Sequence, residues 1–272
     1  MNTPPLVAII GPGRLGTGLA RALVSGGWNV VVLGRNVQAE WKAHLAGRAL
    51  VLIAVPDDSI SEVATALAAA GAIGHDQVVL HTSGARDRGV LKTLEGQAKG
   101  LGSFAPVQTV ADPATAAERL RGAFVVLEGD ESAIAMGRIL AEQLQMQRVE
   151  LSAEAKIAYH AGAVIVANLG VALEAMAERV ASGGGVPPEV AAEIYLPLWQ
   201  GMVDNLTAMG PGASLTGPVR RGDVETIVRH LAVLRGSERE AYLALSREAL
   251  RLAERAGLER WKLDEMGKVL GK

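Results

Sequence analysis

The chain has 272 residues, of which 49% are hydrophobic and 21% charged, a composition typical of a folded protein long enough for two domains. Its net charge of −2 gives no electrostatic basis for binding nucleic acid or an anionic membrane. The absence of cysteine excludes disulfides, thiolate catalysis and cysteine-bound zinc, and it is compatible with a cytoplasmic protein.

The first predicted element is a strand that leads through a glycine turn into a helix. Residues 6–10 are apolar, and Gly11, Gly13 and Gly16 follow them immediately before a helical pattern. In this arrangement the glycines allow a tight turn, a close approach of backbone to phosphate, and packing of helix on strand. The helix N-terminus then offers unpaired N–H donors to a diphosphate. The sequence therefore predicts a dinucleotide-binding turn, and a plain glycine-rich turn is the alternative.

The second predicted strand, residues 28–33, ends just before Arg35 and Asn36. Proteins that bind NAD place an acidic residue about 20 residues after the glycines, where it accepts hydrogen bonds from the ribose hydroxyls. Arg35 stands at this distance, and its guanidinium can instead donate two parallel hydrogen bonds to a 2′-phosphate. This residue favours NADP over NAD, with a solvated surface arginine as the alternative.

Further strands are predicted between helical segments, at residues 49–55, 77–80, 100–104, 123–127 and 148–151. Strands that alternate with helices are typical of an α/β fold, and we expect a doubly wound parallel Rossmann sheet. Ligands of such sheets bind at the carboxyl ends of the strands, where Val55 and Pro56 end the third one. The predicted cofactor-binding residues are Gly11, Gly13, Arg14, Leu15, Gly16, Arg35, Asn36, Val55 and Pro56.

From Ser152 onward the pattern is helical. Residues 152–182 form one long apolar helix, and a second helix over residues 189–209 contains Pro197, which must kink it. A loop rich in glycine and proline at residues 210–218 precedes the last helices. We expect the long helix to be buried rather than to cross a membrane, because glycine and polar residues interrupt it. The first residues show no signal-peptide pattern.

Two domains are therefore predicted, a dinucleotide-binding Rossmann domain at residues 1–151 and an all-helical domain at residues 152–272. Reduction by a nicotinamide also requires a group that delivers a proton. Lys156 and His160 are four residues apart on the long helix, share one of its faces, and can both donate a proton. The alternatives are a solvated lysine and a hydrogen-bonded core histidine. The spacing of the histidines suggests no metal site.

Several motifs carry a resemblance to a known superfamily: HTSGA at residues 81–85, GSFAPVQT at 102–109, Lys156 with Tyr159-His160-Ala161, and LTGPVRRGD at 215–223. With the glycine turn, they make the chain resemble the 6-phosphogluconate and β-hydroxyacid dehydrogenases, ketopantoate reductase and pyrroline-5-carboxylate reductase. It is most similar to Rossmann-like oxidoreductases whose helical C-terminal domain is of unknown function. Ala105 departs from their pattern, which has histidine at this position.

The resemblance implies an NADP-dependent reductase that forms a homodimer through its helical domain. Lys156 is placed like a lysine that acts as acid or base in better-known relatives. The resemblance also implies that Ser83 and Gly84 lie near nicotinamide and substrate, and that Thr216 and Arg221 help to bind the substrate. The simpler alternative for Ser83 is a helix cap, since serine is a favoured residue at that position.

We therefore expect an NADP-dependent oxidoreductase that reduces a small carbonyl or imine substrate, such as a ketopantoate-like 2-keto acid. The expected partners are a small-molecule substrate and a second copy of the chain, with no nucleic acid and no membrane. The alternative is a sensor or scaffold protein that binds NADP(H) without turnover. Ala105, in place of the histidine of the resembling pattern, keeps that alternative open.

Overall fold

The computed structural model describes residues 4–271 and divides into two compact units, the first ending at Val166 and the second beginning at Ala167. The division lies inside the long helix α6 (Ala153–Gly183), whereas the boundary predicted after Leu151 marks the start of that helix.

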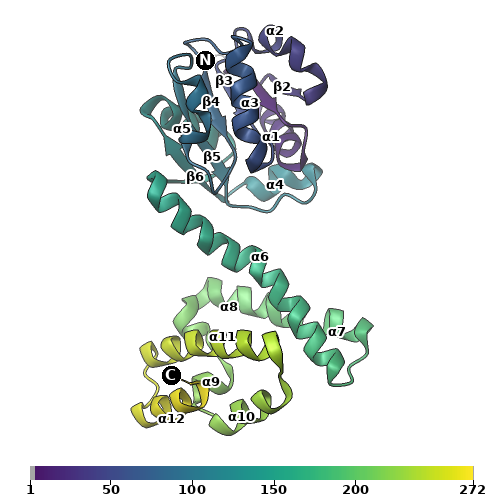
Figure 1. The fold of residues 1–272 in the computed structure, drawn as a ribbon, viewed down its shortest axis with the longest axis vertical. Coiled ribbons are helices and arrows are strands. Elements are labelled where there is room, and N and C mark those ends of the chain that lie inside the picture. Colours follow the sequence, from purple (N-terminus) through teal and green to yellow (C-terminus); the bar gives the residue numbers. More distant parts are fainter. Residues whose placement is uncertain (1–3, 272) are drawn as a thin grey trace. The chain divides into compact units, whose positions relative to one another are not determined.

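The first unit contains a seven-stranded sheet with the strand order β2-β1-β3-β4-β5-β6-β7 (Figure 1). Each strand begins or ends within a few residues of the predicted position. Their bounds are β1 Val7–Ile10, β2 Val30–Leu33, β3 Leu50–Ile53, β4 Val78–His81, β5 Gly100–Pro106, β6 Phe124–Gly129 and β7 Gln147–Glu150. The chain order reverses beside β1, which pairs with both β2 and β3, and this reversal creates the crevice where such sheets bind ligands.

The sheet is mostly parallel rather than fully parallel as predicted. Strands β1 to β5 run in one direction, but β6 pairs with β5 in the antiparallel sense, and β7 is parallel to β6. The chain leaves β5 at Pro106 and enters β6 at the same end of the sheet, because Pro106 pairs with Val125 near the start of β6. This connection holds only the short η3 (Pro113–Thr115) and α4 (Ala116–Leu120), and no helix carries the chain back along the sheet.

Apolar side chains cover both faces of the sheet in two clusters. One cluster includes residues of α1 (Arg14–Ser25), α4 and α5 (Glu131–Gln143), and the other includes residues of α2 (Trp41–Leu45), α3 (Asp57–Ala69) and η2 (Arg88–Leu94). The inner strands β1 and β3 are buried at every position, as expected of parallel strands covered on both sides. The α/β class predicted from the sequence is confirmed.

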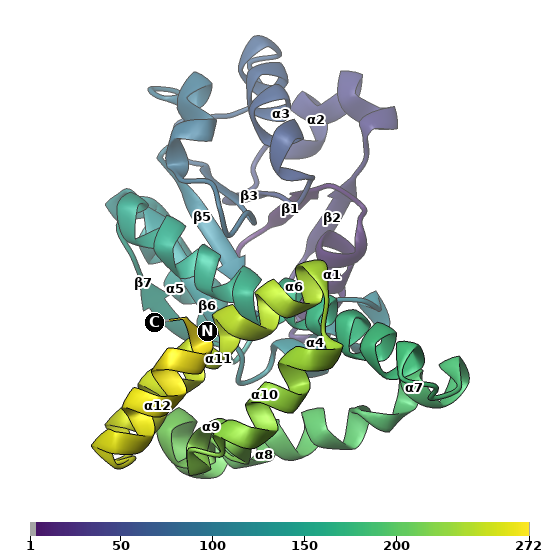
Figure 2. The ribbon, with the colours of Figure 1, turned by 60° about the horizontal axis from the view of Figure 1, so that its bottom comes forward.

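The second unit is helical (Figure 2). Apolar residues of its last four helices form its core. Its helices after α6 are α7 Pro188–Ile194, α8 Leu196–Ser214, α9 Gly217–Arg221, α10 Val224–Val233, α11 Gly236–Arg255 and α12 Arg260–Leu270. Val219, Ile227, Leu250, Met266 and Leu270 are the buried residues that α9 to α12 contribute to this core.

Two predicted features of the helical unit are wrong in detail. The single kinked helix at residues 189–209 is two helices, because the chain breaks at Tyr195 and Pro197 lies in the first turn of α8. Proline is tolerated there, where its missing N–H would have no helical partner. The predicted loop at residues 210–218 is mostly helical, with one break at Gly210, whose φ of 72° is left-handed, and a second at Leu215 and Thr216, between α8 and α9.

The middle of helix α6 is not buried within the chain, contrary to the expectation from its apolar sequence. Ile165, Val166, Leu169 and Val171 have exposed fractions between 54% and 78%. The helix is also long and apolar enough to cross a membrane by length and composition, a criterion that core helices of other proteins meet as well. The exposed apolar residues lie in the middle of the helix.

Candidate functional site

The glycine turn after β1 has the backbone geometry that its sequence predicts. Gly11 has a φ of 120°, and a β-carbon there would collide with the carbonyl oxygen of Ala54. A β-carbon at Gly16 would collide with the carbonyl oxygen of Gly11. Both glycines are therefore required by the close contact of the turn with α1 and with the end of β3.

Gly13 differs from these two glycines, because a β-carbon there would meet no protein atom within 4 Å. Gly13 is the N-cap of α1, makes no side-chain capping bond, and is followed by a first turn without acidic residues. The backbone N–H groups of Arg14 and Leu15 begin the helix, where such groups have no intrahelical acceptor. This helix end therefore fits an anionic group such as a phosphate.

A cavity of about 230 Å³ opens beside this turn. It lies between the ends of β1, β2 and β3, and its lining includes Gly11, Gly13, Leu33, Arg35, Gln38, Trp41, Val55, Pro56 and Glu62. Arg35 is exposed at the start of η1 (Arg35–Glu40), on the wall of the cavity. The structure thus brings most of the predicted cofactor-binding residues to one cavity. Asn36 is exposed, and its side-chain oxygen turns back toward Gly34 rather than lining the cavity.

A second polar site lies across the sheet, toward β6. His81, Ser103 and Glu128 are direct partners in adjacent strands, because β4 pairs His81 with Ser103 and β6 pairs Ser103 with Glu128. Partners in register point to the same face of a sheet, so the three side chains form one polar row. All three are at least 96% buried. On the same row, the strands on the other side of His81 carry Ile53, Ile10 and Leu33.

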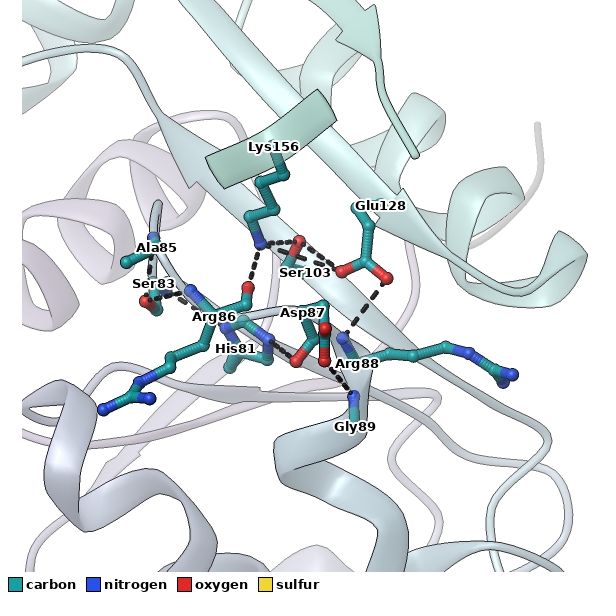
Figure 3. A network of polar contacts seen from close by, with 10 residues as sticks. All are labelled: His81, Ser83, Ala85, Arg86, Asp87, Arg88, Gly89, Ser103, Glu128 and Lys156. Carbon is teal, nitrogen blue, oxygen red and sulfur yellow. Dashed lines mark hydrogen bonds and ion pairs between the residues drawn. The ribbon is translucent and has the colours of Figure 1, made fainter. Parts of the chain in front are cut away.

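Lys156, from the first turns of α6, extends its ammonium group into this row (Figure 3). Its Nζ donates hydrogen bonds to the carbonyl oxygen of Arg86 and, at 2.5 Å, to Ser103 Oγ, and it lies 3.7 Å from Glu128 Oε2. The other carboxylate oxygen of Glu128 accepts a hydrogen bond from the backbone N–H of Arg88 at 3.2 Å. Burial lowers the pKa of Lys156 from 10.5 to about 8, and the nearby Glu128 limits the shift.

His81 is fully buried and holds the start of the loop after β4, which contains Arg86 (Figure 3). Its Nδ1 accepts a hydrogen bond from the backbone N–H of Ser83, so its Nε2 carries the proton that is donated to the carbonyl oxygen of Asp87. Burial and the charge of Lys156 lower the pKa of His81 to about 3, which keeps the ring neutral. Ser83 is not a helix cap: its Oγ accepts hydrogen bonds from the backbone N–H groups of Ala85 and Arg86, within the loop.

His160 lies one helical turn beyond Lys156 and faces a different part of the loop. Its ring packs against Gly84, where an added β-carbon would be 2.8 Å from His160 Nδ1. The ring is half-buried, and no hydrogen bond to it is found within residues 4–271. The structure therefore brings His160 to Gly84, while Lys156 ends in the polar row.

The predicted site residues of the second unit are placed less specifically. Thr216 is the exposed N-cap of α9 and makes no capping bond with its side chain. Arg221 is exposed and lies 3.8 Å from Asp223, whose carboxylate caps α10 by accepting a hydrogen bond from the N–H of Thr226 at 3.1 Å. Within the described residues, no group of three or more His, Asp and Glu side chains is placed to hold a metal ion.

Sequence reasoning missed Ser103 and Glu128 as members of the site and gave His81 no role of its own. The available signal was Glu128, a charged residue near the end of the apolar stretch at residues 124–127. Charged side chains are rarely fully buried unless they are paired, so this one indicates a partner inside the fold. The identity of the partner depends on the pairing of three strands, which the local pattern does not reveal.

This fold and this glycine turn define a Rossmann-like α/β domain, and residues 3–101 match a family model described as a Rossmann-like domain. Residues 123–249 match a second model, a domain of unknown function designated DUF2520. The chain thus joins a region that matches a Rossmann-like domain to a region that matches DUF2520, as the sequence motifs predicted.

Several solved structures share the fold of this chain. The protein TM1727 from Thermotoga maritima is 25% identical, with a TM-score of 0.71, and the match covers 92% of this chain and 99% of that one. A candidate NADP oxidoreductase from Bacteroides fragilis, BF3122, is 22% identical (TM-score 0.65; 93% and 98% covered). Pyrroline carboxylate reductase from Plasmodium falciparum, solved with NADP bound, is 9% identical (TM-score 0.60; 93% and 97% covered). No curated protein sequence matches the chain.

Proposed function

We propose that the protein is an NADP-dependent oxidoreductase that reduces a small carbonyl or imine compound. The observation that carries this proposal is the cavity beside the glycine turn, with an open helix N-terminus at one side and Arg35 on its wall. An open helix N-terminus can bind a diphosphate, and the guanidinium of Arg35 can bind a 2′-phosphate. The NADP-binding and reductase descriptions of structural relatives support the same cofactor and reaction class.

In this proposal Gly13, Arg14 and Leu15 bind the diphosphate through the start of α1, and Arg35 binds the 2′-phosphate. When bound, the cofactor supplies a hydride to the carbon that is reduced. The chain must then deliver a proton to the oxygen or nitrogen of the substrate. His160 is suited to this role, because an imidazole can donate a proton to a substrate and its ring lies against Gly84.

We infer that the substrate carries a carboxylate, with a ketopantoate-like 2-keto acid as the first compound to test. The Ser83–Gly84 segment would orient it, and Arg221, which can bind a carboxylate through two hydrogen bonds, is the predicted ligand from the helical unit. Thr216 is proposed as a further substrate contact from the same unit. Both residues are exposed, so a ligand can reach them.

We also propose that the chain forms a homodimer through the apolar residues of α6 to α8. Leu169 and Val171 of α6, Ile194 of α7 and Leu198 of α8 are between 48% and 72% exposed. Monomeric proteins rarely leave large contiguous apolar surfaces in water, and pairing of identical copies is the commonest way to cover them. Sedimentation of the purified chain tests this proposal, which a monomer at micromolar concentration would contradict.

The first experiment is thermal unfolding of the protein with NADPH, with NADH and without nucleotide. A ligand at 100 times its dissociation constant adds about 2.7 kcal/mol of stability and should raise the midpoint by several degrees. A larger shift with NADPH than with NADH would support the role of Arg35. Equal shifts would remove the case for NADP, and no shift with either nucleotide would overturn the proposed function.

The second experiment separates an enzyme from a protein that only binds NADP(H). Oxidation of NADPH is followed at 340 nm with 2-ketopantoate, pyruvate and 1-pyrroline-2-carboxylate as substrates. Turnover with any of them would support the reductase. Binding without turnover would favour the alternative of a sensor or scaffold, for which Ala105 in the buried part of β5 is the relevant departure from the resembling pattern.

A further inference from the structure

The ammonium group of Lys156 is enclosed by acceptors of the protein itself. An ammonium group has three N–H donors, and Nζ faces the carbonyl oxygen of Arg86, the hydroxyl of Ser103 and the carboxylate of Glu128. The side chain has no exposed surface. A substrate could contact Nζ only by displacing one of these partners, which would leave a buried polar group without its hydrogen bond.

The same ion pair holds two points of one loop. Lys156 binds the carbonyl oxygen of Arg86, and Glu128 binds the N–H of Arg88. The segment between β4 and η2 is therefore attached to α6 at one residue and to β6 two residues later (Figure 3). At its other end, the ring of His81 fixes the N–H of Ser83. Residues 82–88 are thus held at both ends by buried groups.

We propose that Lys156 and Glu128 are positioning residues that hold the segment 82–88, so that Ser83 and Gly84 face His160, and that His160 alone delivers the proton from α6. This inference rests on the proposed reductase function. It assigns different roles to two residues that lie on one helix face. Lys156 ends in the interior of the first unit, while the His160 ring ends at Gly84.

Three substitutions at two positions distinguish positioning from proton transfer. Lys156→Met removes both the charge and the donors. Lys156→Arg keeps the charge and the donors, but a guanidinium stays protonated at any pH used for the assay and cannot deliver a proton. His160→Gln keeps a polar side chain that does not titrate. Lys92→Met, at an exposed position of η2, is the matched control for the first change.

The readouts are amide hydrogen exchange of the peptide covering residues 82–88 and NADPH turnover with the three test compounds. In Lys156→Met, exchange of this peptide should be at least about tenfold faster, because loss of the attachment by Lys156 and Glu128 exposes its amides. Exchange of the α1 peptide, which does not pack against this segment, should stay the same. His160→Gln should keep the protection and lose turnover by about 100-fold or more, the usual size of a general-acid contribution.

Lys156→Arg decides the question. Protected amides together with turnover well above that of Lys156→Met would support positioning. Protected amides with turnover as low as that of Lys156→Met would overturn it, because the chemistry would then require a group that releases a proton. Exchange at the wild-type rate in Lys156→Met would overturn the proposal that Lys156 and Glu128 hold the segment 82–88.

If the larger arginine prevents folding, Glu128→Ala provides the second test. This change frees the N–H of Arg88 and leaves Lys156 in place. The amides of segment 82–88 should again exchange faster, and turnover should fall. Unchanged exchange would overturn the proposal that Lys156 and Glu128 hold this segment. If the wild-type protein reduces none of the test compounds, the proposed function and the assignment of His160 fail together, while the exchange measurements still decide whether Lys156 and Glu128 hold the loop.

Discussion

The ring of His160 occupies the space that a side chain at Gly84 would need. An added β-carbon at Gly84 would be 2.8 Å from His160 Nδ1, closer than real β-carbons come to such atoms. Gly84 does not have a positive φ, so alanine is acceptable to its backbone and the conflict is with the ring alone. The glycine therefore allows a helix residue and a strand-end loop to meet directly.

Gly84→Ala is expected to displace the His160 ring and to lower NADPH turnover about 10- to 100-fold, the usual loss when a reacting group is moved by about 1 Å. The cofactor cavity lies on other strands, so NADPH affinity should stay close to that of the wild type. Gly162→Ala, on the same helix but with open space around the new methyl group, is the control. Equal turnover in wild type and Gly84→Ala would show that the ring has no part in the reaction.

Arg35→Ala tests the selection of the cofactor. A hydrogen bond to a charged group contributes about 1.5–3 kcal/mol, so removal of the guanidinium should weaken NADPH binding by about 10- to 100-fold. NADH lacks the 2′-phosphate, and its affinity should change little. Isothermal titration of both nucleotides measures the difference, with Arg21→Ala at an exposed position of α1 as the control. Equal losses for the two nucleotides would contradict a phosphate contact.

The buried His81 should make the stability of the protein depend on pH in the acidic range. Its pKa is about 3 in the folded chain against an ordinary value of 6.5, so the unfolded state binds a proton below pH 6.5 that the folded state does not. The contribution of the neutral ring is therefore complete above pH 6.5 and is lost as the pH falls toward 3. At pH 4.5 the loss amounts to about 2–3 kcal/mol.

His81→Asn removes this titration while keeping an oxygen that can accept the N–H of Ser83. The stability advantage of wild type over His81→Asn, measured in urea, should shrink between pH 7.5 and pH 4.5 by the amount given above. Comparison of the two proteins cancels the titration of the other acidic groups. His75→Asn, at an exposed position, is the matched control. An advantage that stays constant with pH would show that His81 is protonated in the folded state.

The sequence was sufficient for the features that depend on local patterns. The apolar stretches predict the strands, and the glycine spacing predicts the turn at Gly11, because residues 6–16 alone supply the strand, the turn and the start of the helix. The different surroundings of Lys156 and His160 could not be predicted this way. Their four-residue spacing places them on one helix face, but the acceptors for Lys156 come from three other segments brought together by strand pairing.

The connection from β5 to β6 shows the same limit. The alternation of strands and helices predicts parallel neighbours throughout, yet the short elements between Val107 and Ala123 return the chain to the end of β5 that it has just left. The reversed β6 carries Glu128 to its position beside Ser103. The feature of the fold that the sequence did not predict is thus the one that builds the polar row.

The buried pair of Lys156 and Glu128 should behave as a coupled unit in unfolding measurements. Removal of one partner leaves the other as an uncompensated buried charge, and such changes typically destabilise a protein by about 3–5 kcal/mol. Lys156→Met and Glu128→Leu should each show a loss of this size. The double variant leaves no buried charge behind, so it should be more stable than either single variant, with the two losses far from additive.

The matched control is the pair Glu225 and Arg229, whose side chains are both 75% exposed and whose separate losses should add. Additive losses at Lys156 and Glu128 would show that the two charges do not depend on each other in the folded protein, and the loop would then lack the joint attachment on which its positioning rests.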